Sequence, residues 1–260
     1  MSTRDDDSPT VSMPALARIV AIAKEAGDAI MRHYQHDAVS DTKPDGSPLT
    51  DADRASHDII EQRLTEWSPH VPIISEEGVI PAYDERRAWR RFWLVDPLDG
   101  TKEFLSRNDE FTVNIALIED GEPVLGAIVA PAVHRCWFAG RGLGSWTERG
   151  GGVPTRIWST PAPADVPLTV VESRSHPSER LERYLQSVEI ARRIPAGSSI
   201  KFCLVAEGLA DIYPRFGPTM EWDVAAGDCI FRNSGRDVPR RSPLVYNTAT
   251  LRNGDFIVGN

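Results

Sequence analysis

The hydrophobic pattern predicts two helices near the start of the chain. Over residues 12–34, apolar side chains recur every three or four positions, as in an amphipathic helix, and Pro14 suits the first turn. A second helix is expected over roughly 52–67, with Thr50 or Asp51 as its N-cap. Each helix therefore offers one apolar face for packing.

Shorter apolar runs after these helices predict strands. The runs VPIIS (71–75) and FWLVD (92–96) are short and end at polar or acidic residues. The stretch 112–131 contains two apolar runs around the turn residues 120–121, and 135–146 has the pattern of a further hairpin. We therefore expect this half of the chain to form an antiparallel sheet covered by helices.

The glycine- and proline-rich segment 150–167 is the best candidate for a boundary between two halves. Beyond it, helical and extended patterns alternate. The sequence thus predicts an α+β protein built in layers, with a disordered tail (1–11), an N-terminal half (12–155) and a C-terminal half (156–260). In the second half we expect strands over 168–173, 210–215, 244–247 and 255–259, and helices around 178–188, 199–208 and 222–233.

Charge and composition exclude several classes of function. The formal net charge is −9 and the pI is near 5.2, whereas binding to nucleic acid polymers or anionic membranes needs a basic surface. No apolar window of about 18 residues exists, so no transmembrane segment is predicted. The three cysteines lack pairing or metal-ligand spacing and are expected in the core of a reduced, cytoplasmic protein. The mixed-charge run 84–91 is predicted to be a solvated helix face.

Two aspartates at the end of a buried strand give the strongest chemical signal. Asp96 and Asp99 need a partner, because a buried carboxylate costs several kcal/mol unless it is paired or bound to a metal. Pro97 fixes the backbone and Gly100 allows a tight turn, so both carboxylates and the Leu98 carbonyl can converge. Such a set of oxygens suits a hard cation such as Mg²⁺.

Further carboxylates fall at the ends of other predicted elements. Glu76 and Glu77 follow a strand, Asp51 and Asp53 lie near the start of the second helix, and Asp223 opens a later helix. An aspartate in any single turn more often serves only as a cap. Several such ends in one chain favour a shared metal site instead.

The motifs that carry these carboxylates resemble those of a known family. DPLDGT, WDVAAG and the upstream SEE resemble the lithium-sensitive, magnesium-dependent phosphomonoesterases that include inositol monophosphatase, fructose-1,6-bisphosphatase and the bisphosphate nucleotidases. DGTKEF, FTVNIALI, GSSIKFCLVAEG and DIYPRFGPTMEWD are closer to the CysQ-type 3′(2′),5′-bisphosphate nucleotidases. The resemblance covers the chain from about residue 16 onward and implies a layered αβαβα sandwich.

The resemblance also implies a metal site and a catalytic pair. Thr101 would hydrogen-bond the attacking water, and Asp53 would polarise Thr101 and accept a proton, although Asp51 is an alternative for that role. Glu77 would lie outside the metal ligands or hold a bound water. Two or three Mg²⁺ ions, with Li⁺ as an inhibitor, would be held by Glu76, which also counts as catalytic, and by Asp96, the Leu98 carbonyl, Asp99 and Asp223.

A second group of residues is implied to contact the substrate. Three of these residues have an ordinary alternative: Ser198 as an N-cap, Lys201 as a solvated helix residue and His176 as a loop histidine. Lys43 is predicted to be a surface-loop lysine. The implied contacts are Gly100, Ser175, His176, Ser198, Lys201, Arg215 and Asp223, with Ser175 and His176 near the base and sugar.

The function implied is removal of the 3′-phosphate from adenosine 3′,5′-bisphosphate, and from 3′-phosphoadenylyl sulfate, in sulfur assimilation. Inositol-1-phosphate and fructose-1,6-bisphosphate are alternative substrates, because the metal site alone does not recognise the leaving group. A catalytically silent metal- or nucleotide-binding regulator is an alternative of another class. The spacing of Asp96 and Asp99 argues against the haloacid-dehalogenase phosphatases, whose aspartates are two positions apart. A monomer or a homodimer is expected.

Overall fold

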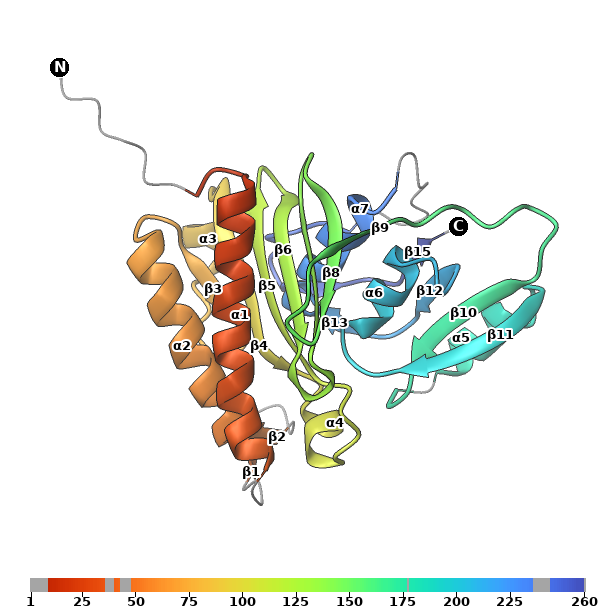
Figure 1. The fold of residues 1–260 in the computed structure, drawn as a ribbon, viewed down its shortest axis with the longest axis horizontal. Helices are drawn as coiled ribbons and strands as arrows, with labels where there is room; N and C mark the ends of the chain where they lie inside the picture. The colour runs from red at the N-terminus through yellow and green to blue at the C-terminus, as the bar shows by residue number, and fades with distance from the viewer. Residues whose placement is uncertain (1–8, 36–39, 43–47, 177, 236–243, 260) are drawn as a thin grey trace.

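The computed structural model describes residues 9–35, 40–42, 48–176, 178–235 and 244–259. Helices and sheets alternate in five layers, and the first four of them follow one another from left to right in Figure 1. The predicted α+β fold, a layered αβαβα sandwich, is confirmed. No helix among the described residues combines the length and apolar character needed to cross a bilayer.

Two long helices form the first layer, as the hydrophobic pattern predicts. They are α1 (Met13–Tyr34) and α2 (Asp51–Trp67). The Ser12 side chain caps α1, and the Thr50 side chain caps α2 by accepting a hydrogen bond from the backbone N–H of Asp53. Of the two caps that the sequence allows for α2, the structure therefore uses the threonine.

A seven-stranded sheet forms the second layer. Its order is β3-β4-β5-β6-β7-β8-β9, and every neighbouring pair except β3 and β4 is antiparallel. The prediction of an antiparallel sheet is thus confirmed for all but its first pair. The strands are β3 (Ile73–Ser75), β4 (Arg91–Asp99), β5 (Thr112–Glu119), β6 (Glu122–Ala130), β7 (Arg135–Gly140), β8 (Gly144–Arg149) and β9 (Thr155–Ile157).

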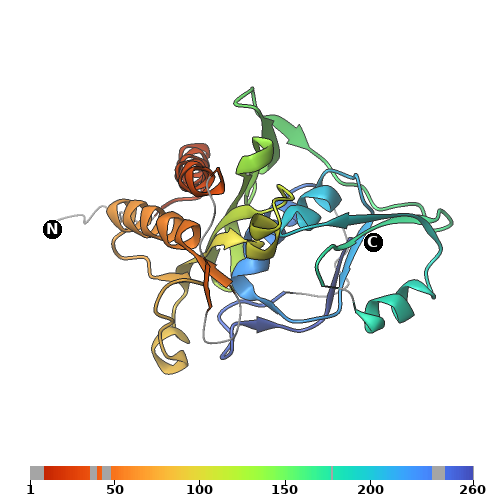
Figure 2. The same cartoon turned by 90° about the horizontal axis from the view of Figure 1, so that it is seen from below.

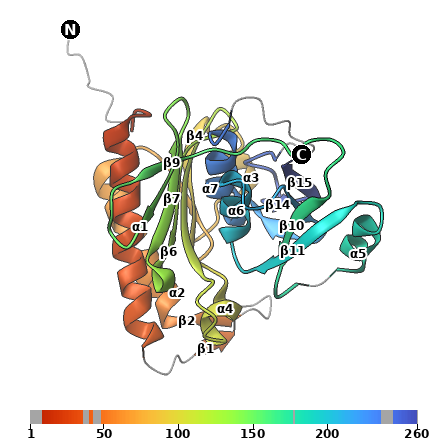
Figure 3. The ribbon, with the colours of Figure 1, turned by 45° about the vertical axis from the view of Figure 1, so that its right-hand side comes forward.

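The remaining layers come from the second half of the chain. Helices α6 (Ile200–Ala206) and α7 (Glu221–Arg232) lie between the two sheets, and α5 (Glu179–Leu185) lies on the far side of the second sheet, as Figure 3 shows. The second sheet has the order β11-β10-β12-β15 and comprises β10 (Leu168–Ser173), β11 (Ile190–Ala196), β12 (Ile212–Arg215) and β15 (Phe256–Gly259). The short elements are β1 (Ser40–Thr42), β2 (Pro48–Thr50), α3 (Tyr83–Arg86), α4 (Thr101–Leu105), a 3₁₀ turn (Pro131–Val133), β13 (Thr219–Met220) and β14 (Arg252–Asn253).

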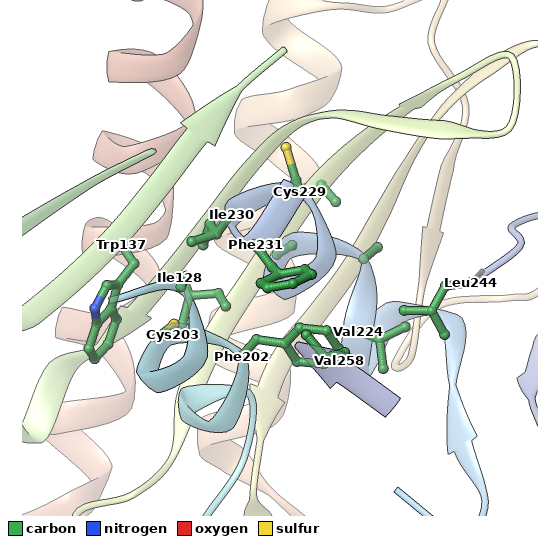
Figure 4. Packing of buried hydrophobic residues seen from close by; sticks show 14 of the residues in the cluster. Ile128, Trp137, Phe202, Cys203, Val224, Cys229, Ile230, Phe231, Leu244 and Val258 are labelled. Carbon is green, nitrogen blue, oxygen red and sulfur yellow. The ribbon is translucent and has the colours of Figure 1, made fainter. Parts of the chain in front are cut away.

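Three apolar clusters fill the spaces between the layers. In the cluster around the middle helices, Phe202 of α6 and Phe231 of α7 lie on the side of the first sheet that carries Trp137 (Figure 4). A Cβ on Gly227 would lie 2.5 Å from the ring of Phe202, so only glycine allows α6 and α7 to approach this closely. All three cysteines are buried, which agrees with their predicted place in the core, and none of them forms a disulfide among the described residues.

The short strands β1, β2, β9, β13 and β14 are not predicted from the sequence, and two further differences concern longer segments. The edge strand β11 is not predicted, because it carries exposed arginines and Pro195 instead of an alternating apolar pattern. The strand predicted over 244–247 is wrong. There the backbone N–H groups of Asn247 and Thr248 donate to the buried carboxylate of Glu221, at 2.6 and 2.8 Å, and are not part of a strand ladder.

Two of the expected segment boundaries can be compared with the structure. The boundary at 155/156 falls inside β9, the last strand of the first sheet. Of the expected tail, residues 1–8 lie outside the described residues, and so does Lys43. Pro9 is buried, and its carbonyl accepts a hydrogen bond from Arg91.

The charge run 84–91 is not wholly solvated, which corrects the prediction. Arg86 is only 2% exposed. Its guanidinium donates to the carbonyls of Pro81 and Ala249 and to Oδ1 of Asn247, at 3.2, 2.9 and 2.7 Å. Arg86 therefore ties α3 to the C-terminal segment, which in turn holds the start of α7 through Glu221.

Replacing Arg86 with methionine should destabilise the fold. The substitution leaves three buried oxygens without their donor, so we expect a loss of about 2–4 kcal/mol in the free energy of unfolding. Arg87→Met is the matched control, because Arg87 is exposed and lies 3.6 Å from Asp84; its effect should stay within about 0.5 kcal/mol. Urea unfolding measures both, and equal stabilities for the two variants would contradict this role of Arg86.

Candidate active site

A pocket of about 310 Å³ opens where the first sheet meets the C-terminal half of the chain. Figure 2 looks onto this end of the molecule, with α4 near the middle of the view. The wall combines mainly acidic residues from the first half with mainly basic residues from the second, while Lys102 and Asp223 carry the opposite charge in their halves. Its acidic and basic residues are Glu76, Asp96, Asp99, Lys102, Glu103, His176, Lys201, Arg215 and Asp223.

A β-bulge explains how two aspartates three positions apart can line one pocket. Side chains alternate along a strand, so Asp96 and Asp99 would point to opposite faces of a regular β4. Asp96 pairs with Asn114 of β5 and Asp99 pairs with Thr112, so three steps on β4 match two on β5. This bulge turns both carboxylates and Leu98 toward the pocket.

The residues next to the bulge hold it in place. The hydroxyl of Ser56 on α2 donates to the carbonyl of Pro97 at 2.7 Å, and the N–H of Leu98 donates to Asp96 at 3.1 Å. Gly100 has φ of +92° and also lines the pocket. This left-handed conformation favours glycine and lets the chain turn directly from β4 into α4.

Carboxylates from three separate elements meet beside the bulge. Glu76 follows β3, Asp96 lies in β4, and Asp223 is the third residue of α7. One carboxylate oxygen from each lies within 4.8 Å of the other two. The other role of Asp223 is to cap its helix, since Oδ2 accepts the N–H of Met220 at 2.8 Å. Glu77, in contrast, does not line the pocket.

Burial perturbs the charges of this cluster. It raises the pKa of Asp99 to about 6, while the charge of Lys201 and a hydrogen bond from Asn114 act in the opposite direction. The pKa of Asp223 is raised well above its ordinary value, first by burial and then by the charge of Asp99. Converging carboxylates of raised pKa are stabilised by a cation. All the side-chain atoms that could bind a metal here are carboxylate oxygens. The site therefore fits a hard divalent cation, the kind of ion that prefers oxygen ligands.

Asp53 and Thr101 lie next to one another although 48 residues separate them. Asp53 is buried, and its Oδ2 accepts both the N–H and the hydroxyl of Thr50, at 2.7 and 2.6 Å. Its other oxygen lies 3.4 Å from the Thr101 hydroxyl, which lines the pocket. Asp51 is exposed and pairs with Arg54 at 3.3 Å. The geometry therefore favours Asp53 over Asp51 as the partner of Thr101.

Asn114 orients Asp99 and was not singled out from the sequence. It is buried in β5, donates to Asp99 at 3.3 Å, and accepts hydrogen bonds from Thr112 and Ser199 at 3.1 and 2.8 Å. An amide side chain inside the otherwise apolar run VNIALI is the signal that marks it. Because Ser199 precedes α6, Asn114 also connects the two halves of the chain at the pocket.

Basic residues and backbone turns line the side of the pocket formed by the C-terminal half. Lys201 is buried, its ammonium donates to the carbonyls of Ala196 and Ser198, and burial lowers its pKa to about 8. Arg215 donates to the Pro218 carbonyl at 3.0 Å, and its buried Nε has no hydrogen-bond partner among the described residues. Lys201 is therefore not the solvated helix residue of the alternative interpretation.

The serines and the histidine occupy different places. Ser198 has φ of +48° and precedes Ser199, which is the N-cap of α6. Ser198 is therefore not the N-cap that the alternative interpretation expects. Its hydroxyl lies 2.6 Å from that of Thr112, and it lines the pocket. His176 also lines the pocket, whereas Ser175 does not and instead donates to Glu103.

The comparison with known proteins agrees with this geometry. The inositol monophosphatase family profile matches residues 14–260. The chain belongs to the inositol monophosphatase family. This is a family of metal-dependent phosphatases, and the acidic cluster fits that property.

Similar members of the family are bacterial proteins. The chain is 47% identical to the 3′(2′),5′-bisphosphate nucleotidase CysQ of Salmonella typhimurium over 86% of this chain and 89% of that one. It is 46% identical to the CysQ of Escherichia coli strain K12, over 89% of this chain and 93% of that one. The crystal structure of CysQ from Bacteroides thetaiotaomicron superposes with a TM-score of 0.80 at 42% identity, covering 95% of this chain and 96% of that one.

Proposed function

We propose that the protein is a phosphatase that removes the 3′-phosphate of adenosine 3′,5′-bisphosphate, with 3′-phosphoadenylyl sulfate as a second substrate, in sulfur assimilation. The observation that carries the proposal is the pocket itself, in which a cluster of carboxylates faces two basic residues, Lys201 and Arg215. Relatives named 3′(2′),5′-bisphosphate nucleotidase, at 46–47% identity over most of the chain, support this substrate.

The metal ions of the proposed enzyme are two or three Mg²⁺, with Li⁺ as an inhibitor. When bound, Mg²⁺ would screen the phosphate dianion, acidify a water molecule and stabilise the leaving oxygen. The convergence of oxygens and the raised pKa of Asp99 support this assignment. The residues that would hold the ions are Glu76, Asp96, the Leu98 carbonyl, Asp99 and Asp223.

Asp53 and Thr101 would orient the attacking water and take its proton. Two of the hydrogen bonds that Asp53 accepts come from Thr50, and these fix its carboxylate. Its other oxygen can then accept from Thr101, whose hydroxyl oxygen accepts from the water. In this arrangement a proton leaving the water moves toward Asp53 through the threonine.

The C-terminal half would bind the rest of the substrate. Arg215 supplies a buried guanidinium nitrogen without a partner among the described residues, and such a donor suits a phosphate oxygen. Lys201 adds a second positive charge, and Gly100 and Ser198 line the space beside it. His176 would contact the sugar or base, and Ser175 would support this wall through Glu103.

A substrate comparison tests this proposal. Phosphate release with Mg²⁺ should be much faster from adenosine 3′,5′-bisphosphate than from inositol-1-phosphate or fructose-1,6-bisphosphate, and Li⁺ should inhibit it. Preference for either of the other two would favour the alternative substrates. Release from none of them would favour a non-catalytic regulator.

Arg215→Ala should reduce kcat/KM for the bisphosphate by about tenfold or more, because one charge-assisted hydrogen bond to phosphate is lost. The loss on inositol-1-phosphate should be smaller. Arg192→Ala is the control, since Arg192 is exposed on β11 and does not line the pocket. Equal losses on both substrates in Arg215→Ala would contradict a role in binding the second phosphate.

The cellular location and assembly state are also proposed. Three buried thiols that form no disulfide among the described residues suit the reducing cytoplasm. A monomer or a homodimer is expected, and the mass in solution measures it.

A further inference from the structure

Lys102 lines the pocket but has no part in the function proposed above. It follows Thr101 on α4, and its Nζ lies 3.2 Å from Nε2 of His176, which follows β10. Both side chains are exposed at the edge of the pocket. The contact brings together one basic residue from each half of the chain.

The acidic residues nearby do not neutralise Lys102. Among the described residues, no carboxylate forms an ion pair with its ammonium. Glu103, the next residue, is buried and also lines the pocket, but its carboxylate accepts the hydroxyl of Ser175 and forms no ion pair with Lys102 among the described residues. Glu110 is engaged by Arg174 and by the N–H of Gly197. Lys102 thus keeps donors that can reach a ligand.

His176 lies where the basic groups of the pocket converge. Burial lowers its pKa, and the positive charges of Lys102, Arg215 and Lys201 act in the same direction, while Glu103 opposes them. The other nitrogen of the ring lies 3.4 Å from the hydroxyl of Ser173. Lys102 and His176 thus lie close together with no carboxylate between them among the described residues. An anion would stabilise this arrangement of basic groups.

We propose that Lys102, which lies beside His176, binds the phosphate that is not hydrolysed and so determines the preference for bisphosphate substrates. This inference rests on the function proposed above. Arg215 and Lys201 approach that phosphate from the C-terminal half, and Lys102 approaches it from the N-terminal half. The second phosphate therefore bridges the two halves, whereas a substrate with a single phosphate makes no such bridge.

The test compares two substrates that share the scissile bond. We measure kcat/KM for adenosine 3′,5′-bisphosphate and for adenosine 3′-monophosphate, which lacks the second phosphate. In Lys102→Met the ratio of the two values should fall by about tenfold or more, and Lys102→Arg should retain most of it. Arg192→Met, which removes a surface charge outside the pocket, should keep the wild-type ratio. An equal fall on both substrates would overturn the proposal, because it would show that Lys102 only supports the neighbouring Thr101.

A binding measurement separates this inference from the proposed function. Adenosine 5′-monophosphate carries the second phosphate and no scissile one, so its Kd can be measured by calorimetry in EDTA. Lys102→Met should weaken this binding by about tenfold, with adenosine as the uncharged reference ligand. An unchanged Kd would overturn the role of Lys102 whatever the activity. If the wild-type protein binds the monophosphate through Lys102 but releases no phosphate from the bisphosphate, the proposed function fails and the binding site stands.

Discussion

Asp99→Asn is expected to abolish phosphatase activity and, in the same protein, to raise the stability of the metal-free fold at pH 8. The activity should fall by at least about a thousandfold, because an amide is a weaker ligand for a hard cation and the charge that balances the metal is lost. The stability should rise because burial makes the Asp99 carboxylate costly to ionise. Function and stability thus oppose each other at this position.

The pH dependence fixes the sign of the stability effect. The folded-state pKa of Asp99, about 6, lies above the ordinary value of 3.8, so between these values the folded protein binds more protons than the unfolded chain. Stability then falls as pH rises through this window and stays lower above it. We expect the free energy of unfolding of Asp99→Asn at pH 8 in EDTA to exceed that of the wild type by on the order of 1–3 kcal/mol. Its melting temperature should then lie a few degrees higher. The gap should close near pH 4.

Added Mg²⁺ should reverse the order. A ligand that binds only the folded state raises its stability, so the wild type should gain in melting temperature at pH 8 and Asp99→Asn should gain much less. Asp84→Asn, at an exposed position on α3, is the control and should behave as the wild type throughout. A variant that melts below the wild type in EDTA at pH 8 would contradict the argument that Asp99 is buried at a cost.

The sequence predicts the layers and the acidic cluster because each depends on local signals. Helical periodicity and a capping residue are enough to place α1 and α2. The carboxylates stand at element ends beside turn residues such as Gly100, and there the chain has to change direction. The resemblance to the family motifs then implies that the carboxylates at these ends share one site. Asp96 and Asp223 accordingly meet as the resemblance implies.

The contacts that hold the site in place are harder to predict from the sequence, because they join segments far apart in the chain. Arg86 looks like any member of a mixed-charge run, and only the folded structure shows that it meets Asn247. The bulge in β4 depends on its register with β5, which no local pattern encodes. Glu103 and Ser175 lie 72 residues apart, and their hydrogen bond turns the serine away from the pocket.

Asp53→Asn should lower kcat by about 10²–10⁴-fold, whereas Asp51→Asn should leave it within about twofold. The amide oxygen of asparagine can still accept both hydrogen bonds from Thr50, which meet at one oxygen of Asp53, although more weakly than a carboxylate does; its side chain cannot take a proton from Thr101. Asp51 is exposed and forms an ion pair with Arg54 across one helical turn, so it makes a matched control for the loss of one charge in α2. Phosphate release at saturating Mg²⁺ measures both variants.

A structural role for Asp53 would also lower activity, because losing part of the cap costs α2 about 1 kcal/mol. The double variant with Thr101→Val separates the two explanations. If Asp53 acts through Thr101, removing both should cost little more than removing either, as for residues that work as a unit. Independent damage to the fold would instead multiply the two losses. A double variant whose kcat equals the product of the single effects would therefore place Asp53 in the scaffold of α2 and outside proton transfer.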